Sequence, residues 1–292
     1  MQEIHQVPVL LKPQRLSDYA VGLFSRIPTK SAIKKAIKKE LIHVNGEPAS
    51  TALFIKGKEL IECFPESNST TKKQFNFDLN VLFEDDYLAI IDKPAGILVS
   101  GNKFKTVDNA LIQNLQRSTL ADACRPRPVH RLDYPTTGLL LVGKTTAAIS
   151  SLNDLFEHKK IQKSYLAITV GEMEPNGQIH ELIDGKPAET NYRVLSTVKS
   201  KRFNYLNLLL LHPTTGRRHQ LRKHLASIGN EILGEREYGK PEFLLKGKGL
   251  YLHAFSLEFT HPLTNQNFRF QAEVPKRFQK IIGVDCVLEN KT

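Results

Sequence analysis

Segments with strand-like patterns follow one another in runs along most of the chain after residue 80, and this order constrains the fold more than any other feature. They show the apolar runs, or the alternation of apolar and polar residues, that are typical of β-strands. The first two predicted strands lie within 81–96, one on each side of the Asp85–Asp86 turn. The others are 137–143, 163–171, 191–198, 203–212, 250–259 and 267–274. Because these strands do not alternate one by one with helices, the pattern predicts an α+β fold rather than a parallel βαβ sheet.

Two helices are predicted among these strands. Residues 145–160 have helical spacing and begin at Thr145, whose hydroxyl suits an N-cap. Residues 218–229 form the second helix and end at Gly229, a typical C-cap residue.

The N-terminal residues have a different pattern. Apolar residues at helical spacing predict a helix over 15–27, whose buried stripe comprises Leu16, Tyr19, Ala20, Leu23 and Phe24. A second helix is predicted over 30–41, with Thr29 or Ser31 as its cap and Ile33, Ile37 and Leu41 on one face. A strand at 41–44, a turn at Asn45–Gly46 and a further apolar alternation ending at Cys63 complete a small α/β unit.

The second of these helices is strongly basic and suits phosphate contacts. Its lysines are Lys30, Lys34, Lys35, Lys38 and Lys39, and no acid precedes Glu40 within the helix. Residues 65–74 are polar and rich in Pro, Ser and Thr, which is typical of a linker or of a long surface loop. We therefore predict a first domain at 1–66, a linker at 67–76 and a second domain at 77–292.

Charge and cysteine content limit the class of protein. The 292 residues carry 41 Lys and Arg against 30 Asp and Glu, a net charge of +11, which favours a polyanionic partner such as nucleic acid. The 3 cysteines are an odd number and lie far apart, which argues against a disulfide framework and for a reducing compartment. We find no secretory signal and no run approaching the ~18 apolar residues of a membrane helix, so a soluble cytoplasmic protein is expected.

One pattern match is set aside. Residues 138–145, GLLLVGKT, fit the phosphate-binding expression GxxxxGK[ST]. That loop needs a flexible backbone that curls around a phosphate, whereas Leu-Leu-Leu-Val favours a buried strand, and the preceding HRLDYPTT is turn-like. Nucleotide binding is therefore not expected here.

Residues 130–141, HRLDYPTTGLLL, place a histidine, an arginine and an aspartate just before a turn and a buried strand. An aspartate in such a position can act as a nucleophile or a base when an arginine orients it. The same pattern is equally compatible with an aspartate that caps a turn and with Arg131 on the surface.

A second basic cluster lies at 214–225, TTGRRHQLRKHL, at a turn-to-helix junction. Arg218 and Arg222 are four residues apart, so on a helix they would project from the same side. Arginine suits two-pronged binding of phosphate or carboxylate, although a solvated basic face is the commoner role of such a run. His219 and His224 lack metal-ligand spacing, and no metal site is expected.

These segments together resemble RluA-type pseudouridine synthases, which isomerise uridine in RNA. HRLDYPTTGLLL resembles the family signature HRLDxxTSGLLL, and four further blocks follow the family's order along residues 80–275. These blocks are DYLAIIDKPAGILV at 86–99, KSYLAITVG at 163–171, GRRHQLRKHLASIG with ILGEREYG at 216–239, and LHAFSLEFTHPLT with FQAEVP at 252–275. The N-terminal unit resembles the ribosomal S-four-like RNA-binding domain that often precedes this catalytic domain. The resemblance implies a mixed, largely antiparallel sheet with a central cleft.

The resemblance also implies roles for individual residues. Asp133 matches the catalytic aspartate, Tyr165 the tyrosine that packs on the base, and Arg222 the basic partner of the catalytic carboxylate. Arg131 matches the arginine that enters the duplex as the uridine flips out. Further RNA contacts are expected from Arg217, Arg218, Lys223 and the lysine helix. Tyr134–Pro135 replaces a pair that is more often charged or polar in the family, and Glu235 stands where aspartate is usual.

The function expected from the resemblance is isomerisation of specific uridines in ribosomal or transfer RNA, without metal or organic cofactor, by a protein that acts as a monomer. Asp133 would attack C1′ of the ribose or abstract the C2′ proton to give a glycal, and both routes free uracil to rejoin through C5. The alternative is a non-catalytic RNA-binding or ribosome-assembly factor that retains the synthase fold, an alternative motivated by the charge and by the altered 134–135 pair.

Overall fold

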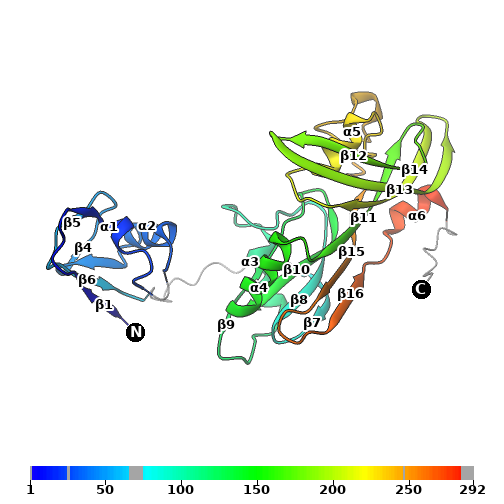
Figure 1. Ribbon diagram of the computed structural model, residues 1–292. Coiled ribbons are helices and arrows are strands. Elements are labelled where there is room, and N and C mark those ends of the chain that lie inside the picture. Colours follow the sequence, from blue (N-terminus) through cyan, green and yellow to red (C-terminus); the bar gives the residue numbers. More distant parts are fainter. Residues whose placement is uncertain (1, 25–26, 66–74, 246, 284–292) are drawn as a thin grey trace. The chain divides into compact units, whose positions relative to one another are not determined.

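The computed structural model describes residues 2–24, 27–65, 75–245 and 247–283 (Figure 1). The chain divides into two compact units, Met1–Lys73 and Gln74–Thr292. The linker predicted at 67–76 lies outside the described residues apart from Phe75 and Asn76. Among the described residues, no helix is both long and apolar enough to cross a membrane.

The N-terminal unit is a small α/β structure around its own apolar core. Its four-stranded sheet has the order β1 (Glu3–Gln6), β6 (Leu60–Cys63), β3 (Ile42–Val44) and β4 (Glu47–Pro48), and β2 (Gln14–Arg15) pairs with β5 (Phe54–Ile55). Helices α1 (Leu16–Tyr19) and α2 (Lys30–Lys38) complete the unit. Asn45 and Gly46 both have positive φ, at 54° and 84°, which is the geometry of the predicted hairpin turn.

The helix predicted at 15–27 is wrong in length. Only Leu16–Tyr19 is helical, because the chain turns away at Gly22, which has a φ of 78° and donates its N–H to the carbonyl of Pro28. The apolar stripe is nevertheless buried, since Leu16, Ala20 and Phe24 are at most 1% exposed. The second helix begins where predicted, with the Thr29 hydroxyl accepting from the N–H of Ala32, but it ends at Lys38, so Leu41 lies beyond it.

The C-terminal unit is built on one 10-stranded sheet that is mixed and largely antiparallel, as the family resemblance implied. The order along the sheet is β12-β13-β14-β11-β15-β10-β8-β7, with β16 beside β15 and β9 beside β10. The strands are β7 (Asn80–Glu84), β8 (Leu88–Lys93), β9 (Ala123–Pro128), β10 (Thr137–Thr145), β11 (Gln162–Val170), β12 (Asn176–Ile183), β13 (Lys186–Ser200), β14 (Asn204–Pro213), β15 (Leu252–Thr260) and β16 (Asn267–Gln271). The helices are α3 (Val107–Asn114), α4 (Thr146–Glu157), α5 (Gln220–Ser227) and α6 (Lys276–Ile282), with a 3₁₀ turn at Pro241–Phe243.

Strand β10 explains why an unbroken apolar run replaces alternation at this point of the sequence. Leu139 and Leu141 pack on one face of the sheet with Leu152 of α4, whereas Leu140 and Val142 pack on the other face with Leu111 of α3. A strand buried on both faces needs apolar residues at every position. The segment that fits the nucleotide-loop expression is thus an interior strand, and the Lys144 ammonium donates to the Glu84 carboxylate at 2.6 Å.

The centre of the sheet is irregular where β10, β11 and β15 meet. Gly138 has a φ of 107°, and a Cβ built there would lie 2.2 Å from the carbonyl oxygen of Ala254, so only glycine allows the parallel pairing of β10 with β15. On the other side of β15 the register with β11 shifts between Ser164 and Tyr165. Such bulges re-aim neighbouring side chains, and the functional residues gather at this point of the fold.

Candidate active site

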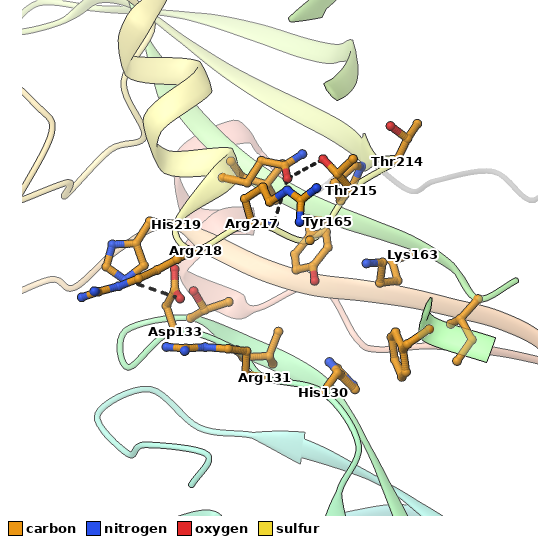
Figure 2. Close-up of a pocket in the computed structure, with 18 of the residues that line it drawn as sticks. His130, Arg131, Asp133, Lys163, Tyr165, Thr214, Thr215, Arg217, Arg218 and His219 are labelled. Atoms are coloured by element: carbon orange, nitrogen blue, oxygen red, sulfur yellow. Dashed lines mark hydrogen bonds and ion pairs between the residues drawn. The ribbon is translucent and has the colours of Figure 1, made fainter. Parts of the chain in front are cut away.

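A cavity of about 990 Å³ opens over this irregular part of the sheet (Figure 2). Its walls come from the loop before β10, the first half of β11 and the segment between β14 and α5. These segments are far apart in sequence and include both the HRLD segment and the basic cluster at 214–225. The fold therefore brings together the two clusters of candidate residues that the sequence showed separately.

Asp133 lies on the loop between β9 and β10, and its carboxylate faces the cavity (Figure 2). Its side chain is 15% exposed, with Oδ1 3.7 Å from Nε2 of His219 and Oδ2 3.8 Å from Nη1 of Arg222. The local turn is closed by the backbone instead, where the N–H of Thr136 donates to the carbonyl of Asp133. The Asp133 carboxylate therefore does not cap the turn, and that alternative is set aside.

A buried lysine lies beneath this loop. The ammonium of Lys93, a fully buried residue at the end of β8, donates to the carbonyls of Pro94 and Thr136 at 2.8 Å each and approaches that of Tyr134 at 3.4 Å. Burial lowers the pKa of Lys93 to about 8, against the opposing charges of Asp133 and Asp92. One side chain thus ties the end of β8 to the part of the loop that directly follows Asp133.

Replacing Lys93 with Met is expected to destabilise the C-terminal unit by about 1–3 kcal/mol, because buried carbonyls lose their donor while the apolar stem is kept. Urea unfolding monitored by circular dichroism measures the change. Lys103→Met, at an exposed position of the same unit, is the matched control. An unfolding midpoint equal to that of the wild type would show that the loop is held by other interactions.

Arg222 has a closer partner than Asp133. Its guanidinium donates through Nε and Nη2 to the two carboxylate oxygens of Glu235 at 2.7 and 2.6 Å, and through Nη2 to Glu237 at 3.0 Å. Arg222 and Glu235 side chains are 3% and 0% exposed. Burial by itself would raise the pKa of Glu235, but the hydrogen bonds from Arg222 and from the N–H groups of Glu237 and Arg236 hold it below its usual value. Arg222 is therefore fixed by Glu235 and presents its remaining nitrogen to Asp133.

The prediction that Arg218 and Arg222 project from one side of a helix is wrong. Helix α5 begins only at Gln220, after His219, which has a left-handed φ of 56°. Arg218 therefore lies before the helix and is exposed, whereas Arg222 is buried. The left-handed residue turns the chain between them, so the two guanidinium groups have different environments.

His219 is a site residue that the sequence reasoning considered only as a metal ligand. Its Nδ1 shares a 2.7 Å hydrogen bond with the hydroxyl of Tyr238, which leaves Nε2 facing Asp133. Burial lowers the pKa of His219, although the charges of Asp133 and Glu237 oppose this shift, so the imidazole is neutral at neutral pH. The position of His219 directly before the helix, inside the basic cluster, was the sequence signal that could have identified it as a site residue. Among the described residues, no group of three or more His, Cys, Asp or Glu could hold a metal ion.

Tyr165 stands on β11 at the register shift and faces the same cavity (Figure 2). Burial and the charge of Asp133 raise the pKa of its phenol, so it stays protonated at physiological pH. A neutral phenol ring at a cavity wall offers an apolar face to a planar ligand and a hydroxyl donor at its edge.

The other residues predicted to contact RNA fall into three groups. Arg131, Arg217 and Arg218 are exposed and line the cavity. Lys223 pairs with Asp184 at 2.8 Å and does not line it. The five lysines of the 30–39 segment are exposed on the N-terminal unit, where Lys30 forms an ion pair with Asp18.

The comparisons with known proteins point to one family. A family model described as RNA pseudouridylate synthase matches residues 87–227. The ribosomal large subunit pseudouridine synthase D of Pasteurella multocida is 32% identical over 300 residues, which cover 92% of this chain and 90% of the relative. An uncharacterised RNA pseudouridine synthase of Aquifex aeolicus is 32% identical over 96% of both chains.

A solved structure agrees on the fold. The human RNA pseudouridylate synthase domain containing 1 superposes with a TM-score of 0.56 at 24% identity, covering 68% of this chain and 84% of that one. With relatives that are at least 30% identical along nearly the whole length, this chain belongs to the RluA-type family of RNA pseudouridine synthases.

Proposed function

We propose that this synthase acts on ribosomal RNA of the large subunit and that Asp133 is its essential catalytic group. The observation that carries the proposal is the Asp133 carboxylate in a basic cavity, 3.8 Å from an arginine that is itself held by a buried glutamate. Relatives that cover most of this chain are named ribosomal large subunit pseudouridine synthases, which supports ribosomal over transfer RNA.

Two routes suit a carboxylate in this position. In the first, an oxygen of Asp133 forms a bond to C1′ of the ribose while the bond from C1′ to N1 breaks and the electron pair leaves on uracil. In the second, Asp133 takes the C2′ proton and the same bond breaks to give a glycal. In both, uracil turns and its C5 bonds to C1′; in the first route this breaks the bond from Asp133 to C1′, and in the second Asp133 returns its proton to C2′ of the glycal. The proton on C5 then leaves to the carboxylate of Asp133, which either route has set free, and N1 of the uracil gains a proton.

The target base must leave its stack to reach this carboxylate, which costs a few kcal/mol. We assign Tyr165 the role of a stacking surface for the flipped uracil, because its ring is neutral and lies in the cavity. We assign Arg131, exposed at the rim beside Asp133, the role of filling the space that the base leaves. Arg222 orients the carboxylate.

We further propose that residues 1–66 form an RNA-binding domain of the ribosomal S-four-like type, joined by a linker at 67–76 to a catalytic domain at 77–292. The support is a separate compact unit with an exposed, lysine-rich helix α2. With Arg217, Arg218 and Lys223, this helix would bind phosphates of the RNA. The protein would act as a monomer in the cytoplasm, where bacterial ribosomal RNA is modified.

Replacing Lys34, Lys35 and Lys38 with Gln is expected to weaken RNA binding and to flatten its salt dependence by roughly one unit of slope for each phosphate that the variant no longer binds. Binding titrations at several salt concentrations measure the slope. Lys12→Gln with Lys56→Gln, at exposed positions of the same unit, controls for a general loss of charge. A triple variant with the wild-type slope would move the RNA surface to Arg217, Arg218 and Lys223.

A pseudouridine map of total RNA tests the proposed function. Carbodiimide-based sequencing would compare cells that lack the gene with cells that carry the wild type or Asp133→Asn. A large-subunit uridine that is modified only with the wild type would establish the enzyme and its target together. A map that is identical in all three strains would favour the non-catalytic RNA-binding alternative.

A further inference from the structure

One cation in the cavity wall is partly buried and has no acceptor among the residues that the structure describes. Lys163 is half-buried, and no hydrogen bond or ion pair joins its ammonium to any described residue. Every other lysine or arginine that is not exposed in the described ranges has an oxygen acceptor. Examples are Lys144 with Glu84 and Lys223 with Asp184, at 2.6 and 2.8 Å.

The surroundings of Lys163 shield the charge without neutralising it. Its Nζ lies 5.7 Å from the centre of the Phe156 ring, and a Cβ built on Gly216 would lie 3.9 Å from it. The neighbouring His130 is held neutral, because burial and the charge of Lys163 lower its pKa to about 3, and its Nε2 accepts from the N–H of Leu141. Partial desolvation of an unpaired cation is unfavourable, and it lowers the pKa of Lys163. An anionic ligand group at this point would remove that cost.

The strand geometry fixes where such a group would lie relative to the target base. Lys163 and Tyr165 are two residues apart on β11 and both line the cavity (Figure 2). Ser164 between them does not line it, and its hydroxyl shares a hydrogen bond with that of Ser256. Two residues along a strand span about 7 Å. A ligand whose base stacks on Tyr165 would therefore present to Lys163 a group outside the base itself. In RNA, the anionic group outside the base is the backbone phosphate.

We propose that Lys163 binds a phosphate that flanks the target uridine and so holds the flipped nucleotide over Asp133. The inference rests on the proposed function and adds a positioning residue to it. A lysine ammonium is a compact point charge that suits a phosphate oxygen, and the open backbone at Gly216 leaves room for the approach.

The test combines protein variants with a neutral phosphate. RNA fragments carry the uridine identified in the map, with a methylphosphonate placed either 5′ or 3′ of it. Lys163→Met is expected to lower kcat/KM on unmodified RNA about 10–100-fold, the range for a hydrogen bond to a charged group. Lys163→Arg is expected to recover part of the loss. Lys160→Met, also basic but outside the cavity, is expected to behave like the wild type.

The decisive result is the coupling between the Lys163→Met substitution and the methylphosphonate. One of the two methylphosphonates should weaken the wild type by a similar factor and have no further effect on Lys163→Met, because both changes remove the same interaction. Affinities measured with Asp133→Asn, which binds without turnover, should show the same coupling. Additive losses at both phosphates would overturn the proposal and indicate that Lys163 binds the base or the sugar. Inactivity of the wild type on every fragment would instead overturn the proposed function.

Discussion

Asp133→Asn is expected to lower the rate of uridine isomerisation by at least about 10⁴-fold, because the amide can neither attack C1′ nor accept a proton. The side chain keeps its size, and its neighbours His219 and Arg222 in the wild type are 3.7 and 3.8 Å away, so the fold loses no short hydrogen bond. RNA affinity is expected to stay within about threefold of the wild type, since the substitution removes no group that binds phosphate. Single-turnover assays and binding titrations on one RNA fragment measure both quantities.

Asp154→Asn is the matched control for this experiment. Asp154 is exposed on α4 and does not line the cavity, so the same chemical change there should leave the isomerisation rate unaltered. Substantial turnover by Asp133→Asn, with an unchanged melting temperature, would remove Asp133 from the mechanism. His219 and Tyr165 would then be the groups left to examine in the same cavity.

Glu235→Gln is expected to give the largest loss of stability. Breaking one side of a buried ion pair costs about 3–5 kcal/mol, because the remaining charge is left without its partner. Glu235 is fully buried and binds Arg222 through both carboxylate oxygens, so solvent screening does not reduce this figure. For a unit of this size the loss corresponds to a melting temperature lower by roughly 10 °C. Calorimetry measures it, and Glu258→Gln, in a more exposed pair with Arg269, is the control.

The sign of the pH dependence follows from the lowered pKa of Glu235. The carboxylate contributes its stabilisation above the unfolded-state value near 4.3, and the contribution is lost as the pH falls through the lower folded-state value. The gap in stability between the wild type and Glu235→Gln should therefore be widest at neutral pH and narrow below about pH 4. A gap that stays constant with pH would mean that the altered packing, rather than the charge, accounts for the effect.

Glu235→Asp distinguishes the contribution of the carboxylate charge from that of the side-chain length. Aspartate is the residue usual at this position in the family, and it keeps the charge while shortening the side chain by one methylene. We expect a smaller loss of stability than for Glu235→Gln, accompanied by a lower isomerisation rate, because Arg222 would be held less firmly beside Asp133. Equal losses for both variants would show that the two-pronged geometry matters more than the charge.

Local patterns in the sequence were sufficient where one short segment decides the structure. The Thr145 cap, the Asn45–Gly46 turn and the apolar run at 137–143 all formed as predicted, because their causes lie within a few residues. The length predicted for the helix at 15–27 was wrong, because helical spacing showed which side chains are buried but not which backbone conformation brings them into the core. Gly22 breaks the helix, and Phe24 still reaches the core.

In the candidate site, too, some features could be predicted from the sequence and others could not. HRLDYPTTGLLL and the four other blocks were enough to identify the family and to single out Asp133, Tyr165 and Arg222 from the sequence alone. The sequence could not show that Arg222 binds Glu235 more closely than Asp133, or that His219 faces the carboxylate. Nor could it show that Lys93 holds the loop from below, or that Lys163 has no acceptor among the described residues. These facts depend on distances between segments that only the sheet brings together, and burial and charge pairing are properties of that assembled surface.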